Sequence, residues 1–366
     1  MRRRTFLATA LAATSASRLL AAVKAKTWDG ATQILQQAVE SKQIRAAVLH
    51  VKHQGDSFTK PFGKGVADDS MFLLGSISKP INVAAVMAVF DQGKFQLDDP
   101  VRKFLPEFTG EGRDAVTIRH LLTHVSGLPD QVAANNRLRS SHAPLLKFAE
   151  ETIKTPLEFS PGSKYQYSSM GILLATRIAE VLSGQDILTL VDRTVFKPLE
   201  MKHSAQGLGK FAQDAMIPVQ MEGAAPESGG GDPNAKDWDW NSAYWRKLGA
   251  PWGGTHCSAP DIGRFLDEFL HARGKALRPE TARLMTRNHN PDGFTPRGLG
   301  FGVGKASGSS GCSERTFGHT GSTGTLCWAD PASDTICVVL TSLPRRGAQR
   351  HPRERAAEQV AAAIQS

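Results

Sequence analysis

Cysteine is scarce in this chain, with four among 366 residues. None of them belongs to a Cys-x-x-Cys pair or to a zinc-type spacing, so neither a redox dithiol nor a structural zinc site is indicated. Cys257 and Cys312 are isolated in the sequence. Cys327 and Cys337 lie on two strand-like runs joined by residues 330–334, and a disulfide between them stays open because it depends on strand register.

Acidic residues are missing from positions 1–25, and no later stretch is both long and apolar enough to be a transmembrane helix. The segment begins Met-Arg-Arg-Arg-Thr-Phe-Leu and continues as a mildly apolar Ala/Leu/Thr/Ser stretch that is too short to span a membrane stably. It resembles a twin-arginine export signal, with Val23-Lys24-Ala25 as a candidate cleavage site. We therefore expect an exported protein, periplasmic or extracellular, without a stable transmembrane anchor. An ordinary secretory signal or a frayed N-terminal helix is the alternative.

A strong basic excess is also missing from the rest of the chain. The formal net charge is +9, but five of the positive charges lie before residue 26, which leaves +4 scattered over the remainder. That is too little to indicate a phosphate-backbone ligand, so we expect no nucleic-acid partner. With 40% hydrophobic and 22% charged residues, the chain has the composition of a globular protein of one large or two closely joined domains.

The most informative stretch is residues 72–80, which leads into a long apolar segment that stops at Gly93. A segment that is apolar on all faces is typical of a buried helix, with Ser76 as its N-cap, Pro80 in the first turn and Gly93 at the C-terminal cap. Residues three apart share a helix face, so Lys79 can reach the Ser76 hydroxyl. An amine kept neutral by burial can take a serine proton. A capping serine beside a surface lysine is the alternative.

Tyr167 stands just before another apolar segment, residues 172–182, which we expect to be helical. The dipole of a helix N-terminus and nearby lysines favour a phenolate there, so Tyr167 is a candidate general base. The alternative is a half-buried tyrosine with a hydrogen-bonded hydroxyl.

His120 and His124 have the i, i+4 spacing of zinc ligands. However, no glutamate follows His120 and no third ligand is near, so we expect a packed or hydrogen-bonded role and no metal.

Strand-like runs occupy 46–52, 298–303, 316–322, 325–328 and 335–341, the last four as an antiparallel meander. Residues 62–67 are the expected partner of the first run. Residues 222–236 have the composition of a flexible loop. The aromatic cluster after this loop either lines a substrate mouth or packs beneath the loop, and packing is favoured; it comprises Trp238, Trp240, Tyr244, Trp245 and Trp252.

Three short motifs follow one another in a fixed order: Ser76-Ile77-Ser78-Lys79, Tyr167-Ser168-Ser169 and His319-Thr320-Gly321. In this order they resemble the active-site elements of the penicillin-recognising serine hydrolases, in the branch of class C β-lactamases, D-alanyl-D-alanine carboxypeptidases and serine esterases. Accessory stretches agree, and the likeness covers about residues 30–345; these stretches are Leu97–Val101, Arg119–Leu128, Pro161-Gly162 and Pro251–Gly254.

The resemblance implies an α+β fold. An antiparallel sheet flanked by helices would be built from residues 26–100 and 250–366, and a mostly helical domain, residues 101–249, would be inserted between them. It also implies that Ser76 attacks an acyl carbonyl while Lys79 and Tyr167 move the proton, without metal or organic cofactor. The other implied site residues are His319 in the catalytic set, the backbone N–H groups of Ser76 and Ser322 as the oxyanion hole, and Ser169, Thr320 and Gly321 for substrate binding.

Two departures from the family pattern bear on the substrate. His319 stands where β-lactamases of this class more often carry lysine, and histidine is largely neutral at pH 7. Ser169 stands where Tyr-x-Asn would place asparagine, and its hydroxyl donates only one hydrogen bond. We predict an esterase-like serine hydrolase acting on a small-molecule ester, lactam or peptidoglycan-type peptide. The alternatives are a D-alanyl-D-alanine carboxypeptidase, a weak β-lactamase, a non-catalytic peptidoglycan-binding protein, or an interaction protein on a hydrolase scaffold.

Overall fold

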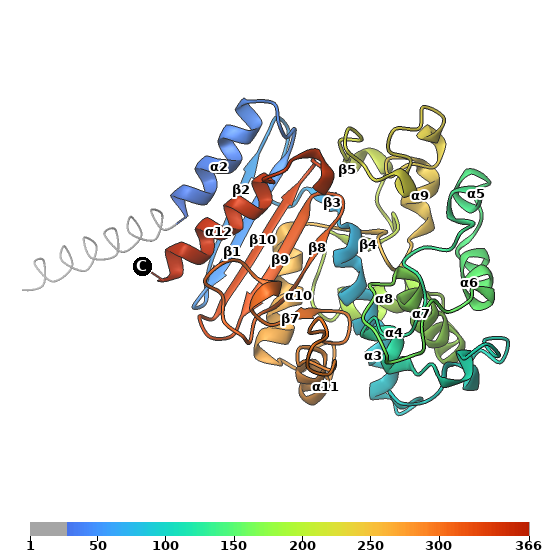
Figure 1. Cartoon of the computed structure of the whole chain (residues 1–366). Helices are drawn as coiled ribbons and strands as arrows, with labels where there is room; N and C mark the ends of the chain where they lie inside the picture. The colour runs from blue at the N-terminus through green and yellow to red at the C-terminus, as the bar shows by residue number, and fades with distance from the viewer. Residues whose placement is uncertain (1–27, 366) are drawn as a thin grey trace, which may run out of the picture.

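The computed structural model describes residues 28–365, and its centre is a six-stranded antiparallel sheet (Figure 1). The predicted export segment, residues 1–25, lies outside the described residues. Within residues 28–365 no helix is long and apolar enough to cross a membrane. In spatial order the strands are β2 (Asp56–Phe62), β1 (Ala47–His53), β10 (Thr335–Thr341), β9 (Thr325–Asp330), β8 (Phe317–Gly321) and β7 (Gly302–Val303). The two ends of the chain therefore share one sheet, as predicted.

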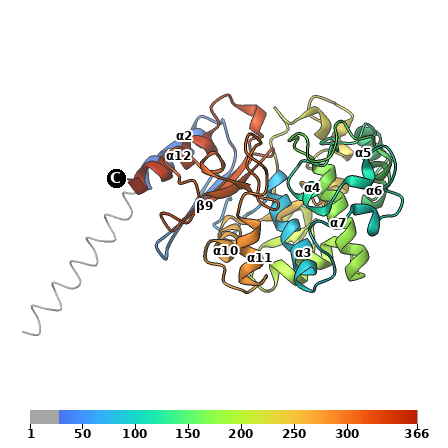
Figure 2. The same cartoon turned by 60° about the horizontal axis from the view of Figure 1, so that its bottom comes forward.

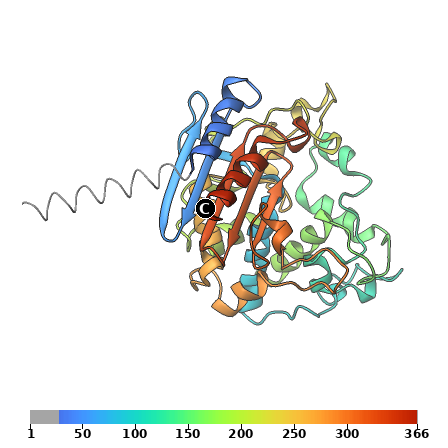
Figure 3. The same cartoon turned by 60° about the vertical axis from the view of Figure 1, so that its left-hand side comes forward.

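Helices cover both faces of this sheet. On one face α2 (Asp29–Glu40) and α12 (Pro352–Gln365) lie side by side, and α10 (Ala259–His271) packs on the other (Figures 1 and 3). Successive strand residues point to opposite faces. Val48 accordingly joins the core on the α10 side, whereas the next residue, Leu49, joins the core under α2 and α12.

The same alternation separates two cysteines. In the observed register Cys327 pairs with Val338, and Cys337 pairs with Trp328. Cys327 therefore packs in one apolar core and Cys337 in the other, on opposite faces of the sheet. All four cysteines are free and buried, so the disulfide that the sequence left open does not form.

The predicted partner of the first strand was wrong. Residue His53 pairs with Asp56, so the chain turns through Gln54 and Gly55 and the returning strand is β2, residues 56–62. Gln54 and Gly55 both have positive φ, as such a tight hairpin turn requires. Residues 63–67, which the sequence favoured, form the turn beyond β2.

The helical part lies beside the sheet and is grouped around α3 (Ser78–Asp91) (Figure 2). The other helices are α4 (Ile118–Leu122), α5 (Asn135–Ser140), α6 (Leu145–Lys154), α7 (Ser169–Ser183), α8 (Ile187–Val191), α9 (Ala243–Leu248) and α11 (Pro279–Met285). A small second sheet has the order β4 (Ser204–Gln206), β6 (Thr255–Cys257), β3 (Met71–Leu73) and β5 (Met216–Ile217). One apolar cluster runs through both parts, so the domain boundaries near 100 and 250 stay a prediction.

Helix α3 is the buried helix that the sequence predicts, and it positions the site. Its residues from Ser78 to Val89 are all buried, and burying each large aliphatic side chain contributes about 1.5–3 kcal/mol. Gly93 has φ +72° just after the helix end, as predicted. Ser76 is not its N-cap, because residues 75–77 form a 3₁₀ turn that continues into the helix, and Ile77 caps it without a side-chain hydrogen bond.

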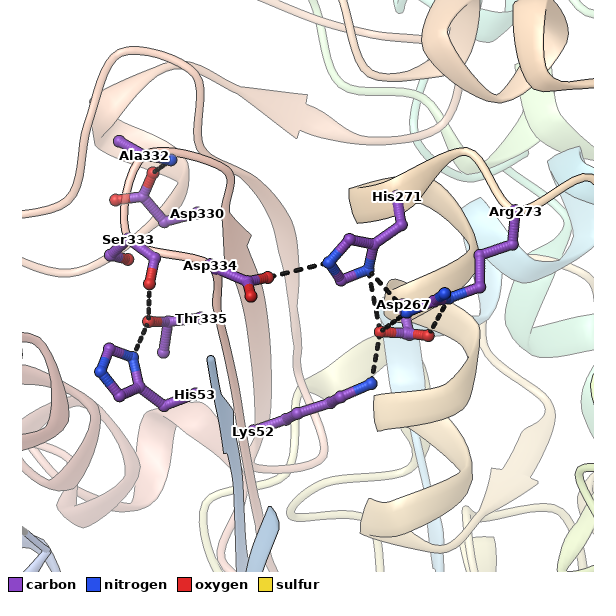
Figure 4. A network of polar contacts seen from close by, with 10 residues as sticks. All are labelled: Lys52, His53, Asp267, His271, Arg273, Asp330, Ala332, Ser333, Asp334 and Thr335. Atoms are coloured by element: carbon purple, nitrogen blue, oxygen red, sulfur yellow. Dashed lines mark hydrogen bonds and ion pairs between the residues drawn. The ribbon is translucent and has the colours of Figure 1, made fainter. Parts of the chain in front are cut away.

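A polar network ties α10 to the far end of the large sheet (Figure 4). Asp267 on α10 accepts hydrogen bonds from Lys52 of β1 and from Arg273, both at 2.6 Å. His271 lies between two carboxylates, with its ring nitrogens 3.0 Å from Asp267 and 2.9 Å from Asp334. Burial raises the pKa of Asp267, but the bonds from Arg273 and Lys52 outweigh it and lower the pKa. The network therefore holds an ionised carboxylate between helix and strands.

Candidate active site

Ser76 lies in the 3₁₀ turn between β3 and α3, with Lys79 one turn further on. Lys79 Nζ is 3.0 Å from Ser76 Oγ and 3.0 Å from the carbonyl oxygen of Trp252, and the lysine is only 1% exposed. Burial lowers the pKa of Lys79 to about 7; Asp130 raises it and Arg297 lowers it further. An amine that is substantially neutral at pH 7 can accept the serine proton.

Tyr167 precedes α7 and faces the same turn. Lys79 Nζ lies 4.7 Å from the centroid of its ring. Its hydroxyl oxygen is buried and, among the described residues, makes no hydrogen bond of regular geometry, although Ser76 is close enough to lower its pKa. Burial is the larger effect and raises the pKa of Tyr167 above its ordinary value. The phenol is therefore neutral at pH 7, and the predicted phenolate was wrong because desolvation outweighs the nearby positive charges.

His124 supports Tyr167 from behind. Its ring centroid is 4.5 Å from that of Tyr167, and its carbonyl accepts from the backbone N–H of Gln166 at 2.9 Å. Its Nδ1 accepts from the backbone N–H of Ser168 at 3.1 Å, so the ring proton is on Nε2. A φ of +63°, in the left-handed region, places the residue in a strained conformation that these contacts hold.

His120 helps to cap the N-terminus of α4. It shares a capping box with Thr117, so both histidines have the packed or hydrogen-bonded role that the sequence favoured. Within residues 28–365 no group of three or more His, Cys, Asp or Glu side chains has metal-binding geometry.

Strand β8 brings the third motif against the Ser76 turn. A Cβ on Gly321 would stand 2.0 Å from the carbonyl oxygen of Leu74, so only glycine allows this approach. The hydroxyl of Thr325 donates to the same carbonyl at 2.6 Å and fixes the distance. The amide nitrogen of Ser322 lies 3.1 Å from where a Cβ of Gly75 would be. Ser322 therefore lies against Gly75, the residue before Ser76, and both predicted oxyanion-hole residues line one cavity.

His319 is a neutral hydrogen-bond acceptor in this arrangement. Its Nδ1 lies 2.7 Å from the carbonyl oxygen of Thr320, which can only accept, so Nδ1 carries the proton and Nε2 carries the lone pair. Burial lowers the pKa of His319 well below its ordinary value, and the charges of Arg297 and Lys79 add to this. Nε2 is buried without a hydrogen-bond partner among the described residues. The prediction of a neutral histidine agrees with this geometry.

Ser169 is held by a residue that the sequence analysis missed. Its backbone N–H and its hydroxyl donate to the same carboxylate oxygen of Asp130, at 2.8 and 2.6 Å. Ser169 is 2% exposed and does not line the active-site cavity. Its predicted role in substrate binding therefore finds no support in the geometry, whereas Asp130 acts on Lys79 through its charge.

A cavity of about 360 Å³ opens over Ser76. Six predicted site residues line it, namely Ser76, Tyr167, His319, Thr320, Gly321 and Ser322, and Lys79 lies behind Ser76. Glu227 of the predicted loop and Trp240 also line it, although Trp238, Trp240, Trp245 and Trp252 are all buried, as the packing interpretation favoured. Arg297 lines the cavity too, and no motif in the sequence marks it.

A larger cavity of about 600 Å³ lies elsewhere, beside α8 and β4. The hydroxyl of Ser204 there is hydrogen-bonded to Asp261 and Cys257, and no lysine is bonded to it. A serine hydroxyl bonded to a buried lysine occurs at Ser76 and not at Ser204. The smaller cavity over Ser76 is therefore the candidate active site.

The chain is similar to known proteins over most of its length. The family model "Beta-lactamase" matches residues 31–362. A "Putative D-alanyl-D-alanine carboxypeptidase" of Salmonella enteritidis PT4 (strain P125109) is 28% identical over 308 residues, which cover 75% of this chain and 70% of that protein.

Two solved structures show the same fold. "EstCE1, a hydrolase with promiscuous acyltransferase activity" superposes with TM-score 0.76 at 22% identity, over 94% of this chain and 100% of that one. The D-amino acid amidase from Ochrobactrum anthropi SV3 gives TM-score 0.76 at 19% identity, over 93% and 99%. At these identities the likeness establishes the α+β fold, which confirms the predicted fold class.

Proposed function

The chain belongs to the β-lactamase family and has the fold of its hydrolases, and we propose that it is a serine acyl hydrolase that cleaves esters through an acyl-enzyme on Ser76. The observation that carries this proposal is the 3.0 Å separation between Ser76 Oγ and the buried amine of Lys79, whose pKa is lowered to about 7. A serine hydroxyl needs such a base at neutral pH.

In the proposed acylation step Lys79 takes the Oγ proton while Oγ bonds to the acyl carbon. The bond from that carbon to the leaving group then breaks. Tyr167, a neutral phenol beside Ser76, gives its proton to the leaving oxygen and is reprotonated by the Lys79 ammonium. In the second step water bonds to the acyl carbon and gives a proton to the Lys79–Tyr167 pair. The bond from that carbon to Ser76 Oγ then breaks, and the pair returns a proton to Oγ, which releases the acid and restores Ser76.

The backbone N–H groups of Ser76 and Ser322 are the proposed oxyanion hole. Their support is the close approach of β8 to the Ser76 turn, which Gly321 permits and Thr325 fixes. Removing one such donor typically costs about 3–4 kcal/mol of transition-state stabilisation.

Esters are favoured over lactams and peptides for two reasons. His319 is neutral and presents a lone pair, so the third motif lacks the cation that a lysine would bring. The Ser169 hydroxyl is engaged by Asp130 rather than facing the cavity. A D-alanyl-D-alanine carboxypeptidase is the second candidate, because the curated relative described above carries that name.

Export belongs to the proposal as well. It rests on the arginine-rich, acid-free residues 1–25. Expression of the full chain in a bacterium with and without a functional twin-arginine pathway, followed by fractionation, tests it. Processed protein outside the cytoplasm only in the competent strain is the expected result.

Intact-mass analysis of the purified mature protein tests the function directly. Wild type and Ser76→Ala are incubated with p-nitrophenyl butyrate, nitrocefin and a D-Ala-D-Ala peptide, and turnover is followed in parallel. We expect a butyryl adduct and turnover in the wild type and neither in Ser76→Ala. A long-lived cephalosporin adduct with peptide cleavage would favour the carboxypeptidase. A folded wild type that forms no adduct with any probe would support a binding protein instead.

A further inference from the structure

A permanent positive charge stands in the wall of the Ser76 cavity. Arg297, in the segment between α11 and β7, is partly buried and lines the cavity together with Ser76 and His319. Its Nε and Nη2 donate to the hydroxyl of Tyr165 at 3.1 and 2.8 Å. Its guanidinium carbon lies 5.4 Å from the centroid of the Tyr167 ring. The guanidinium is thus held at a fixed place beside the reacting groups.

This charge has no counter-ion in the described part of the chain. None of the salt bridges among residues 28–365 involves Arg297, whereas other arginines are paired, for example Arg119 with Asp98 and Arg345 with Glu354. A guanidinium has five N–H donors in a planar fork. The edge formed by Nε and Nη2 donates to the Tyr165 hydroxyl. The other edge, formed by Nη1 and the second N–H of Nη2, remains for a ligand.

Most other groups near Ser76 are less suited to an anion: Arg345 and Arg353 are paired with Glu354, and Arg346 is exposed at the rim. His319 presents a lone pair at Nε2, which repels a carboxylate. Lys79 is bonded to Ser76 and to the Trp252 carbonyl behind the nucleophile. The ionisable arginines and glutamates of the lining leave an excess of positive charge, since they are Arg297, Arg345, Arg346 and Arg353 against Glu227 and Glu354.

We propose that Arg297 binds a carboxylate of the substrate, so that the natural substrates are esters carrying a carboxylate a few bonds from the scissile carbonyl. This inference rests on the proposed acyl-enzyme function of Ser76. A planar guanidinium edge matches a carboxylate with two parallel hydrogen bonds, and partial burial strengthens the attraction relative to an exposed pair. Tyr165 acts as a positioning residue that fixes the direction of the fork.

Matched ester pairs test the inference, because each pair differs only in a carboxylate. Mono-p-nitrophenyl adipate against p-nitrophenyl hexanoate places the charge on the acyl side. The ester 3-carboxyphenyl butyrate against phenyl butyrate places it on the leaving group. For the wild type we expect kcat/KM to be at least about tenfold higher for the anionic member of one pair. The difference should lie mainly in KM and should shrink as salt is added.

The variants Arg297→Gln, Arg297→Lys and Arg283→Gln locate the effect. We expect Arg297→Gln to lower the anionic-to-neutral ratio about 10- to 100-fold, and Arg297→Lys, which keeps the charge but loses the fork, to lower it less. Arg283 is exposed on α11, so Arg283→Gln removes the same charge away from the cavity and should leave the ratio unchanged. Using the ratio cancels any general effect of the substitution on Ser76, Lys79 or folding.

Two outcomes would overturn the inference about Arg297 and leave the proposed function of Ser76 intact. One is an equal ratio in wild type and Arg297→Gln while neutral esters still turn over through Ser76. The other is a ratio that falls in Arg346→Gln but not in Arg297→Gln, which would assign the anion to the exposed rim. If no ester shows Ser76-dependent turnover, the proposed function fails and the inference fails with it.

Discussion

Lys79 Nζ lies 3.0 Å from the backbone carbonyl oxygen of Trp252, a residue 173 positions later in the chain. The carbonyl accepts from the amine and points it at Ser76 Oγ, which is also 3.0 Å away. Since both partners are fixed by buried elements, the amine has little freedom to leave the serine. The contact therefore aligns the Lys79 amine with the Ser76 hydroxyl, as their proposed roles as base and nucleophile require.

The pH dependence of ester hydrolysis follows from the state of Lys79. Only the free amine accepts a proton, and its pKa is lowered to about 7, so kcat/KM should rise with pH through about 7. Asp130 raises this pKa and Arg297 lowers it. The acid limb should therefore move to lower pH in Asp130→Asn and to higher pH in Arg297→Gln. Measuring kcat/KM on a neutral ester from about pH 5 to about pH 9 tests both shifts. An acid limb at the wild-type pH in both variants would contradict the predicted effects of the two charges on Lys79.

Removing the phenol oxygen of Tyr167 should affect catalysis far more than stability. We expect Tyr167→Phe to lower kcat about 10²- to 10⁴-fold, the usual contribution of a proton-transfer group. The free energy of unfolding should hardly change, because this buried oxygen has no hydrogen-bond partner of regular geometry among the described residues. Denaturant unfolding alongside kinetics checks both. Tyr165→Phe is the control, and it should retain most activity on neutral esters.

Ser169→Ala distinguishes a residue that binds substrate from one that supports the site. Because the hydroxyl donates to Asp130 and lies outside the cavity lining, we expect KM for a neutral ester to change less than about threefold. A loss of about 10²-fold in kcat/KM, in a variant that unfolds like the wild type, would instead place Ser169 in contact with the substrate.

The Asp267 network should contribute to stability at neutral pH. Asp267→Asn leaves Lys52, Arg273 and His271 without their shared carboxylate, so we expect the free energy of unfolding to fall by about 1–3 kcal/mol. The pKa of Asp267 is lowered in the folded state, so this contribution is present above its ordinary value of about 3.9 and is lost as pH falls below that.

The control for that measurement is Asp192→Asn, which breaks a more exposed pair with Lys197 and should cost less. Urea unfolding of both variants at neutral and acidic pH gives the comparison. An equal loss in the two variants, or a difference that persists at acidic pH, would contradict the assigned role of Asp267.

Several features could be predicted because they depend on neighbouring residues. The spacing of Ser76 and Lys79 places them together in any helical turn, and the apolar run after them requires a buried helix. The apolar segment 172–182 was likewise expected to be helical, and it lies within α7. The order of three short motifs pointed to the fold through the family resemblance. In the structure, residues from all three motifs line one cavity although they are far apart in the sequence.

The mistaken or open expectations depend on pairing or burial. Cys327 and Cys337 are one register step from facing each other, and that step is set by the whole β9–β10 ladder. The partner of β1 was misplaced, since the pairing register carries the chain back directly after Gly55, and β2 is an edge strand where Pro61 is tolerated. The phenolate of Tyr167 was expected from nearby charge, but burial decides its pKa.

By itself, the sequence determined which groups are the candidates for catalysis: a serine, a lysine one turn away, a tyrosine before a helix and a histidine on a strand. Only the tertiary structure decided how these groups behave. Burial sets the proton affinity of Lys79, a remote carbonyl aims it, and the cavity gathers Asp130 and Arg297 around it from segments with no motif. The physical reason is that desolvation and Coulomb interactions depend on distance in space, which the order of residues does not record.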